Sequence, residues 1–145
     1  MRKVFVIGIG AGDPRHMTVQ AIEALNAVDA VFLLDKGAEK SDLLHLREEI
    51  CARFLTNPHC RMITAPSPPR DAGGDDRAGV DAWHRDKAAL YAGLIRDLGP
   101  DEAGAFLVWG DPALYDSTLR ILETARTTVE FDTDVIPGIS AAQAL

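Results

Sequence analysis

The sequence predicts an α/β fold in which a five-stranded parallel sheet carries helices on both faces. Short runs of consecutive apolar residues alternate with stretches whose apolar residues recur at helical spacing. Most of the runs are apolar throughout, which is typical of strands buried on both faces of a sheet. This alternation continues along the whole chain, and it favours parallel strands joined by right-handed helical crossovers.

The first strand is expected at residues 4–7, where the apolar run VFVI ends at Gly8. A helix follows over residues 18–26, because its apolar residues share one face and Thr18 is a suitable N-cap. Residues 30–34, the run AVFLL, predict a second buried strand.

A second helix is expected to begin at Ser41 or Asp42 and to end near Phe54, since its leucines and isoleucine lie on one stripe. Residues 61–64 predict a short third strand. The stretch 65–79 is rich in Pro, Gly and Asp, so we expect a long loop there, and long loops in compact domains often carry function.

The last third of the chain predicts a helix over about residues 80–98 and a buried strand over 105–108. A further helix is expected at 117–125 and a fifth strand of mixed polarity at 130–136. In such a sheet, ligands bind beyond the carboxyl ends of the strands, so the loops that follow the strands are the candidate functional segments. The final segment from residue 137 resembles the start of another helix.

Length and composition exclude several classes of protein. A chain of 145 residues suits one domain, and 47% hydrophobic with 26% charged residues excludes general disorder. No apolar run approaches the roughly 18 residues of a membrane span, and the first run is too short for a signal peptide. The net charge of −7, without basic runs, argues against nucleic acid as a partner. Cys51 and Cys60 show neither a disulfide framework nor metal spacing, which indicates a cytoplasmic protein without a metal site.

The loop after the first strand reads GIGAGDP over residues 8–14. Alternating glycines allow a sharp turn and a close approach of the backbone to a ligand. A dinucleotide fingerprint requires glycine at position 13, whereas Asp13 stands there and would repel a pyrophosphate. The alternative is a glycine turn that only links strand to helix.

Two later loops have similar features. In WGDPALY, residues 109–115, Gly110 permits close approach, and Asp111 can accept hydrogen bonds from a ligand or cap a helix. The third loop, PGISAA at 137–142, places small residues and a hydroxyl at a helix start, which alone is an ordinary junction.

Together, G-x-G-x-G-D-P, G-D-P-x-x-Y and P-G-I-S-A, each after a predicted strand, resemble the motifs of the tetrapyrrole methylase family. The resemblance implies a methyltransferase that uses S-adenosyl-L-methionine and a small tetrapyrrole substrate, and that forms homodimers. It also implies two α/β domains with the cofactor between them. Residues 1–145 correspond to the first domain, of strand order 3-2-4-1-5, and the second lies outside this chain.

The family's cofactor contacts map onto residues of all three loops. The residues implied are Gly10, Ala11, Gly12 and Asp13, then Trp109, Gly110, Asp111 and Leu114, and finally Ser140 and Ala141. Many relatives have proline where this chain has Ala11, and a glycine or small residue where it has Trp109, so these two side chains depart from the family pattern.

Further stretches, among them FLLDKG, DAWHRDKAALY and FLVWGDPALYDSTLRI, resemble one member of the family closely. That resemblance implies methylation of precorrin-5 at C1 with release of acetate, in cobalamin biosynthesis. Another precorrin methylation is the first alternative. A nicotinamide-dependent oxidoreductase is a second, and a fragment that folds without turnover is a third.

Three residues are candidates for acid–base catalysis. Asp35 stands where some relatives have an acid proposed as a general base, but it can equally be a strand-end carboxylate or the ribose-binding acid of a dinucleotide fold. His16 in the first loop can face the cleft or the solvent, and Tyr115 closes the second motif.

The carboxylates of a tetrapyrrole require cations in this acidic chain. Arg70 and Arg85, in or beside the long loop, and Lys36 at the same sheet edge are the candidates, with plain surface solvation as the alternative. Trp83 is interpreted as a core residue rather than a stacking surface. Because the resemblance leaves half of the cleft outside this chain, we expect the chain alone to bind the cofactor weakly or not at all.

Overall fold

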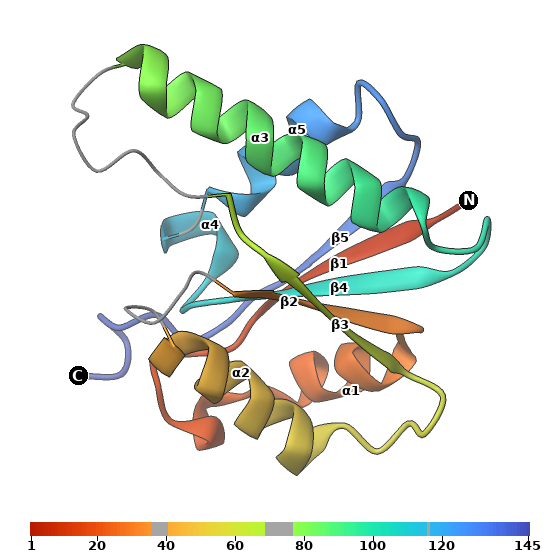
Figure 1. Cartoon of the computed structure of the whole chain (residues 1–145). Helices are drawn as coiled ribbons and strands as arrows, with labels where there is room; N and C mark the ends of the chain where they lie inside the picture. Colours follow the sequence, from red (N-terminus) through yellow and green to blue (C-terminus); the bar gives the residue numbers. More distant parts are fainter. Residues whose placement is uncertain (36–40, 69–76, 116) are drawn as a thin grey trace.

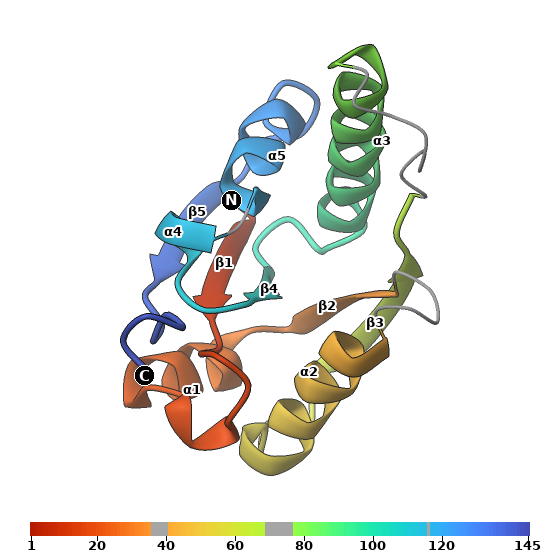
Figure 2. The ribbon, with the colours of Figure 1, turned by 90° about the vertical axis from the view of Figure 1, so that its left-hand side faces the viewer.

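The computed structural model describes residues 1–35, 41–68, 77–115 and 117–145. They form three layers, in which a twisted sheet lies between two layers of helices (Figures 1 and 2). The chain alternates strand and helix in the predicted order.

All five strands pair in parallel, in the order β3-β2-β4-β1-β5, which confirms the predicted sheet and its order. The strands are β1 Lys3–Gly8, β2 Ala30–Asp35, β3 Arg61–Pro66, β4 Ala103–Val108 and β5 Asp132–Ile136. The carboxyl ends of the strands therefore all point to one edge of the sheet, which we call the carboxyl edge, and the opposite one is the amino edge.

Four helices cover the sheet, two on each face (Figure 2). One face carries α1 Val19–Ala27 and α2 Ser41–Phe54, and the other carries α3 Arg77–Arg96 and α5 Thr118–Ala125. Short helical turns, η1 Pro14–His16 and α4 Pro112–Tyr115, stand in the loops of the carboxyl edge. Among the described residues, no helix combines the length and apolar character needed to cross a bilayer.

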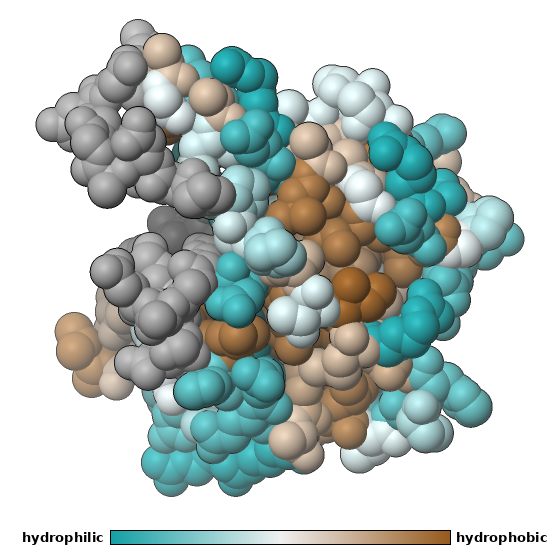
Figure 3. All heavy atoms as spheres, viewed as in Figure 1, coloured by the Kyte–Doolittle hydropathy of each residue, from teal (hydrophilic) through white to brown (hydrophobic). Residues whose placement is uncertain are grey.

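Alternation along the strands divides the core into two clusters. Val4 and Val6 of β1 are fully buried on the side of α3 and α5, whereas Ile7 of the same strand packs with Leu25 and Ile50 on the side of α1 and α2. Edge strand β3 is less covered, since Met62 is 43% exposed. The space-filling view shows hydrophobic surface over this side of the molecule (Figure 3).

The boundaries differ from the sequence prediction by at most three residues, and helix and strand ends usually vary by this much. The expected loop 65–79 was too long, because β3 continues to Pro66 and α3 already begins at Arg77. The turns η1 and α4 were not predicted, because three or four residues show no periodicity. Proline at the start of each was the available signal.

The expected helix start at Ser140 is present as a single hydrogen-bonded turn and does not continue as a helix. The Ser140 hydroxyl accepts from the Gln143 backbone N–H at 3.3 Å, and the Gln143 side-chain oxygen accepts from the Ser140 N–H at 3.0 Å. This reciprocal pair is a capping box, and the Ala144 N–H already bonds to the Ser140 carbonyl.

Charged side chains stabilise the amino edge. The Arg61 guanidinium donates two hydrogen bonds to Glu102, at 2.9 and 3.0 Å, and the Gly99 N–H donates a third at 2.8 Å. These donors, Arg61 foremost, lower the pKa of Glu102 to about 2. Nearby, the Asp29 carboxylate accepts from the Ala103 N–H, which fixes the start of β4.

Candidate functional site

The first and second glycine loops pair directly through their backbones at the carboxyl edge. The Gly110 N–H donates to the Gly10 carbonyl at 2.9 Å, and the Gly10 N–H donates in return at 3.4 Å. This pair is an isolated antiparallel bridge that extends beyond the parallel strands β1 and β4. Two segments a hundred residues apart in sequence are thereby held in one register.

The third loop packs onto the same point. A Cβ added at Gly138 would collide with the Gly110 carbonyl oxygen, and one added at Gly8 would lie 2.6 Å from that same atom. Only glycine permits this contact, because real Cβ atoms do not approach a backbone oxygen so closely. In addition, the Asp111 carboxylate accepts from the Gly138 N–H at 3.1 Å. Three segments that sequence reasoning singled out thus form one cluster.

Three glycines in this cluster adopt left-handed backbone angles. The φ values are +85° at Gly10, +114° at Gly12 and +63° at Gly110, and they are the positive φ values among the described residues. Side chains disfavour this region, so these backbone turns require glycine. Gly10 and Gly110 are buried in the cluster, whereas Gly12 is exposed and its backbone is open to close contact with a ligand.

Trp109 lies against the first loop. A Cβ added at Gly12 would lie 3.3 Å from Cη2 of the indole, so the glycine makes room for the ring. The two residues line a pocket of about 610 Å³, within the range of small-molecule sites. Its other walls come from α2: Leu43, His45, Leu46 and Glu49. Sequence reasoning missed this wall, because its leucines were assigned to the core-facing stripe of the helix.

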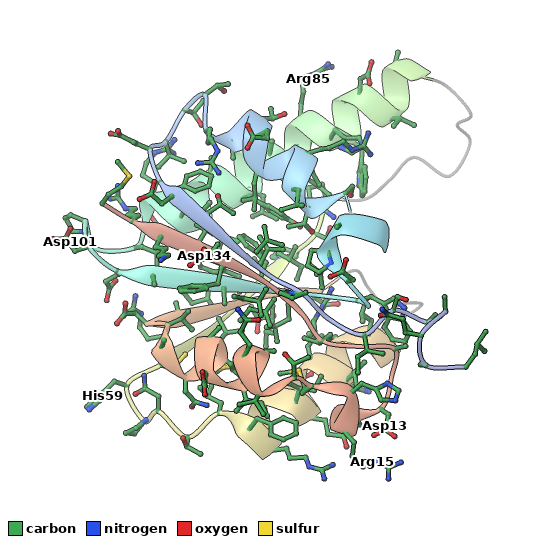
Figure 4. All side chains as sticks on the ribbon, turned by 180° about the vertical axis from the view of Figure 1, so that it is seen from behind. Asp13, Arg15, His59, Arg85, Asp101 and Asp134 are labelled. Atoms are coloured by element: carbon green, nitrogen blue, oxygen red, sulfur yellow. The ribbon has the colours of Figure 1, made fainter. Side chains whose placement is uncertain are left out.

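Asp13 is engaged within its own turn. Its carboxylate accepts from the Arg15 N–H at 2.9 Å and from the Arg15 guanidinium at 2.8 Å, and it caps η1. These hydrogen bonds lower the pKa of Asp13 to about 2. Figure 4 shows the pair on the outside of the first loop. The sequence analysis did not identify Arg15 as the partner of Asp13.

His16 packs under the first loop. A Cβ at Gly10 would lie 2.5 Å from that of His16, so the side chain and the glycine fit closely. In the described part of the chain, Nδ1 of His16 is the buried side-chain polar atom without a hydrogen-bond partner. A buried acceptor or donor without a partner is rare, and it is an available contact for a ligand.

The remaining candidates are more dispersed. Asp35 is exposed at the end of β2, and β4 separates it from β1. Ser140 is 1% exposed and uses its hydroxyl in the capping box, whereas Ala141 is exposed. Arg85 is exposed on the outer side of α3 and points away from the sheet (Figure 4).

For four further candidate residues, the structure describes only the backbone or does not describe the residue. Leu114 and Tyr115 contribute their backbone to α4. Lys36 and Arg70 lie outside the described residues. Ala11, by contrast, is half-buried between two left-handed glycines.

Trp83 is neither a plain core residue nor a free stacking surface. It is half-buried, and its indole N–H donates to the Pro68 carbonyl at 3.1 Å. The structure also reveals two buried cations that the sequence reading missed, Arg47 and Lys87, both beside a second pocket. Cationic side chains on amphipathic helices normally face the solvent, so the positions of Arg47 and Lys87 in the sequence did not indicate that they are buried.

Metal and thiol chemistry have little support in the described residues. No three His, Cys, Asp or Glu side chains gather there closely enough to hold a metal ion. Both cysteines are free, and burial raises the pKa of Cys51 to about 11, which makes it a poor nucleophile.

The strand order argues against a dinucleotide fold. In the doubly-wound dinucleotide-binding order the second strand lies next to the first, so its terminal acid reaches the ribose. Here β4 lies between β2 and β1, and Asp35 is therefore one strand further from the glycine loop. The site is instead a cluster of three backbone loops around Gly110, with an adjoining pocket.

Comparison with known proteins agrees with this geometry. The sequence profile of the Tetrapyrrole (Corrin/Porphyrin) Methylases matches residues 3–145, and the chain belongs to this family. It is 51% identical over 149 aligned residues to precorrin-6A synthase [deacetylating] from Sinorhizobium sp., covering all of this chain and 57% of that protein.

Solved structures show the same fold. The crystal structure of a cobalamin synthesis related protein (CobF) from Corynebacterium diphtheriae superposes with a TM-score of 0.75 at 44% identity, over 99% of this chain and 56% of that one. A uroporphyrin-III C-methyltransferase from Thermus thermophilus, complexed with S-adenyl homocysteine, gives 0.54 at 20% identity, over 96% and 46%. The chain thus spans about half the length of the relatives it matches.

Proposed function

We propose that this chain is the cofactor-binding half of an S-adenosyl-L-methionine-dependent tetrapyrrole methyltransferase. The observation that supports it most is the cluster in which Gly10, Gly110 and Gly138 bring three loops together. Membership of the methylase family and a relative solved with S-adenyl homocysteine agree with this cofactor.

The residues present fit such a cofactor. The glycines at 10, 12 and 110 adopt backbone angles that side chains disfavour, so the loops meet at close range, and Gly12 is exposed beside the pocket that it lines with Trp109. We assign cofactor contacts to the backbones of the first and second loops and to Ser140 and Ala141. The bound cofactor supplies a methyl group on a sulfonium sulfur, and the sulfur leaves as a thioether when a carbon nucleophile takes the methyl. The protein mainly has to align donor and acceptor.

The particular reaction proposed is that of precorrin-6A synthase: methylation of precorrin-5 at C1, with release of the acetyl group as acetate. The 51% identity to that enzyme supports it. Release of acetate requires water to attack the acetyl carbonyl. Asp35, His16 and Tyr115 are our candidates to move the proton, and Arg70, Arg85 and Lys36 are our candidates to hold substrate carboxylates.

The organisation proposed with this function has three parts. Residues 1–145 are the first domain, and a second α/β domain completes the cleft. The complete enzyme is a cytoplasmic homodimer without a structural metal. Its partners are the cofactor and the tetrapyrrole, rather than nucleic acid or a membrane.

Calorimetric titration of the complete enzyme with S-adenosylhomocysteine tests the cofactor, and turnover of precorrin-5 with release of acetate tests the reaction. We expect binding of the homocysteine adduct and none of NAD. Tight binding of NAD without binding of the adduct would contradict the proposal. The 145-residue chain alone is expected to bind the adduct weakly or not at all, and micromolar affinity would show that its three loops suffice.

A further inference from the structure

A second pocket lies at the carboxyl ends of β2 and β4, on the side of α3 and α5. Its volume is about 160 Å³, whereas a single water needs roughly 10–15 Å³. Two cationic side chains line it, Arg47 and Lys87, which are 8% and 4% exposed. Arginine and lysine are seldom buried to this extent in globular proteins.

Arg47 occupies a gap in the sheet. The pairing of β2 with β4 ends at Phe32 and Phe106, although both strands continue toward the carboxyl edge. Beyond this point the Leu107 carbonyl has no strand partner in β2, and it accepts from Nε of Arg47 at 2.9 Å. The arginine comes from α2 on the opposite face, so its guanidinium reaches the pocket between the two strands.

Lys87 approaches the pocket from α3. Its Nζ lies 4.6 Å from the centroid of the Trp83 ring and 5.7 Å from that of Tyr91. Aromatic faces attract a cation and offset part of the free energy lost when its water is removed. The ammonium group is therefore held in place by two rings of its own helix, one turn away on either side.

We propose that this pocket binds a carboxylate of the substrate, with Arg47 and Lys87 as its ligands. Two cations from opposite faces of the sheet meet at one small cavity, and Ser117 and Thr118 add hydroxyl groups to its lining. A carboxylate matches this set, because it accepts several charge-assisted hydrogen bonds at once. It would add to the contacts that both cations already make.

The position of the pocket fits this role, which rests on the proposed function. Val108 lines the pocket, and Trp109 and Gly110 of the second loop follow directly in the chain. A carboxylate held here would anchor one arm of a tetrapyrrole beside the cofactor loops. The pocket is thus a positioning site for the substrate and is distinct from the pocket that Gly12 and Trp109 line.

Steady-state kinetics of the complete enzyme test the proposal. For Arg47→Met and Lys87→Met we expect the KM for the tetrapyrrole to rise at least about tenfold, which corresponds to about 1.4 kcal/mol. The kcat and the affinity for S-adenosylhomocysteine should remain within about twofold. Lys87→Arg keeps a cation in the pocket, so its KM for the tetrapyrrole should stay close to that of the wild type. The matched control is Arg53→Met, which removes an exposed arginine from the same helix. An unchanged KM in both methionine variants would overturn the proposal.

A direct measurement of carboxylate binding tests the pocket even if a methionine variant folds poorly or the enzyme has another activity. The indole N–H resonance of Trp83 is followed in the chain during titration with sodium propionate, against sodium chloride at equal ionic strength. We expect a saturable shift with propionate that Lys87→Arg preserves and Arg47→Met abolishes. No propionate-specific shift in the unmodified chain would refute the pocket. Absence of methyl transfer together with this shift would refute only the proposed function.

Discussion

The two edges of the sheet are closed by different means. At the amino edge, side chains bind backbone and each other: Arg61 pairs with Glu102, the terminal amine with Asp101, and Lys3 with Asp134. At the carboxyl edge, glycine backbones contact one another directly, and Asp13 with Arg15 is the ion pair found there among the described residues. Figure 4 shows Asp101 at one end of the molecule and Asp13 with Arg15 toward the other.

This difference indicates where the molecule is built for stability and where for binding. Ion pairs at exposed positions satisfy the ends of strands, but their side chains fill the surface and leave little room for a ligand. Glycine contacts fix three loops at close range without side chains between them, and Gly12 of the first loop stays exposed. Both pockets described above are lined by residues of, or next to, this carboxyl edge, whereas a third pocket, of about 290 Å³, is lined mainly by residues of α3 and α5.

The largest effect is expected from Gly138→Ala. The new methyl group would collide with the Gly110 carbonyl and separate the second loop from the third. Overpacking of this kind costs about 1–3 kcal/mol of unfolding free energy. We expect a lower Tm and at least a tenfold loss of affinity for S-adenosylhomocysteine in the complete enzyme, measured by thermal melting and calorimetry.

Gly93→Ala in α3 is the matched control. An added Cβ there has no atom within 4 Å, and alanine in a helix is favoured over glycine by roughly 0.5–1 kcal/mol. This variant should melt at a higher temperature with unchanged cofactor affinity. Equal behaviour of the two alanine variants would contradict the role assigned to the glycine contact.

Asp111 allows a sharper test of the same edge. Its carboxylate accepts from the Gly138 N–H, so Asp111→Ala leaves that donor without its partner and should cost about 1–3 kcal/mol. Asp111→Asn keeps an acceptor oxygen, so it should retain the stability of the wild type. If asparagine restores stability but not cofactor affinity, the carboxylate contacts the ligand as well. Chemical denaturation and calorimetry of both variants separate the two roles.

A smaller effect is expected at the amino edge from Glu102→Gln. The pKa of Glu102 lies near 2 in the folded chain, below the ordinary 4.5, so its contribution to stability is present above pH 4.5 and is lost as the pH falls toward 2. The Tm difference between wild type and variant should therefore shrink over this interval. Cofactor affinity should not change, and a loss of affinity would show that the two edges are coupled.

The elements that the sequence predicts well are those whose pattern is local. In the run at residues 4–7, Val4, Val6 and Ile7 are fully buried and Phe5 partly, because the strand lies inside the sheet, and Thr18 caps α1 through the Ala21 N–H, as expected. The glycine motifs were found because close backbone approach requires glycine whatever the partner is. Their place at the carboxyl edge was expected from the parallel strands, whereas their meeting point around Gly110 comes from the structure alone.

What the sequence did not reveal depends on contacts distant along the chain. Arg47 is buried because β2 and β4 diverge, and no local pattern shows where two strands separate. Lys87 is buried because Trp83 and Tyr91 flank it under the same helix. The wall of the pocket beside Trp109 was missed for a similar reason, since an apolar stripe has the same spacing whether it faces the core or a ligand.

The central claim is that the three glycine loops of the carboxyl edge bind the cofactor. Hydrogen exchange of the complete enzyme, with and without S-adenosylhomocysteine, tests it most directly. The account predicts slower exchange at residues 8–13, 109–115 and 137–141 of this chain, and no change at 29, 61 and 99–103 of the amino edge. Protection at the amino edge, or protection that leaves the three loops unchanged, would contradict it.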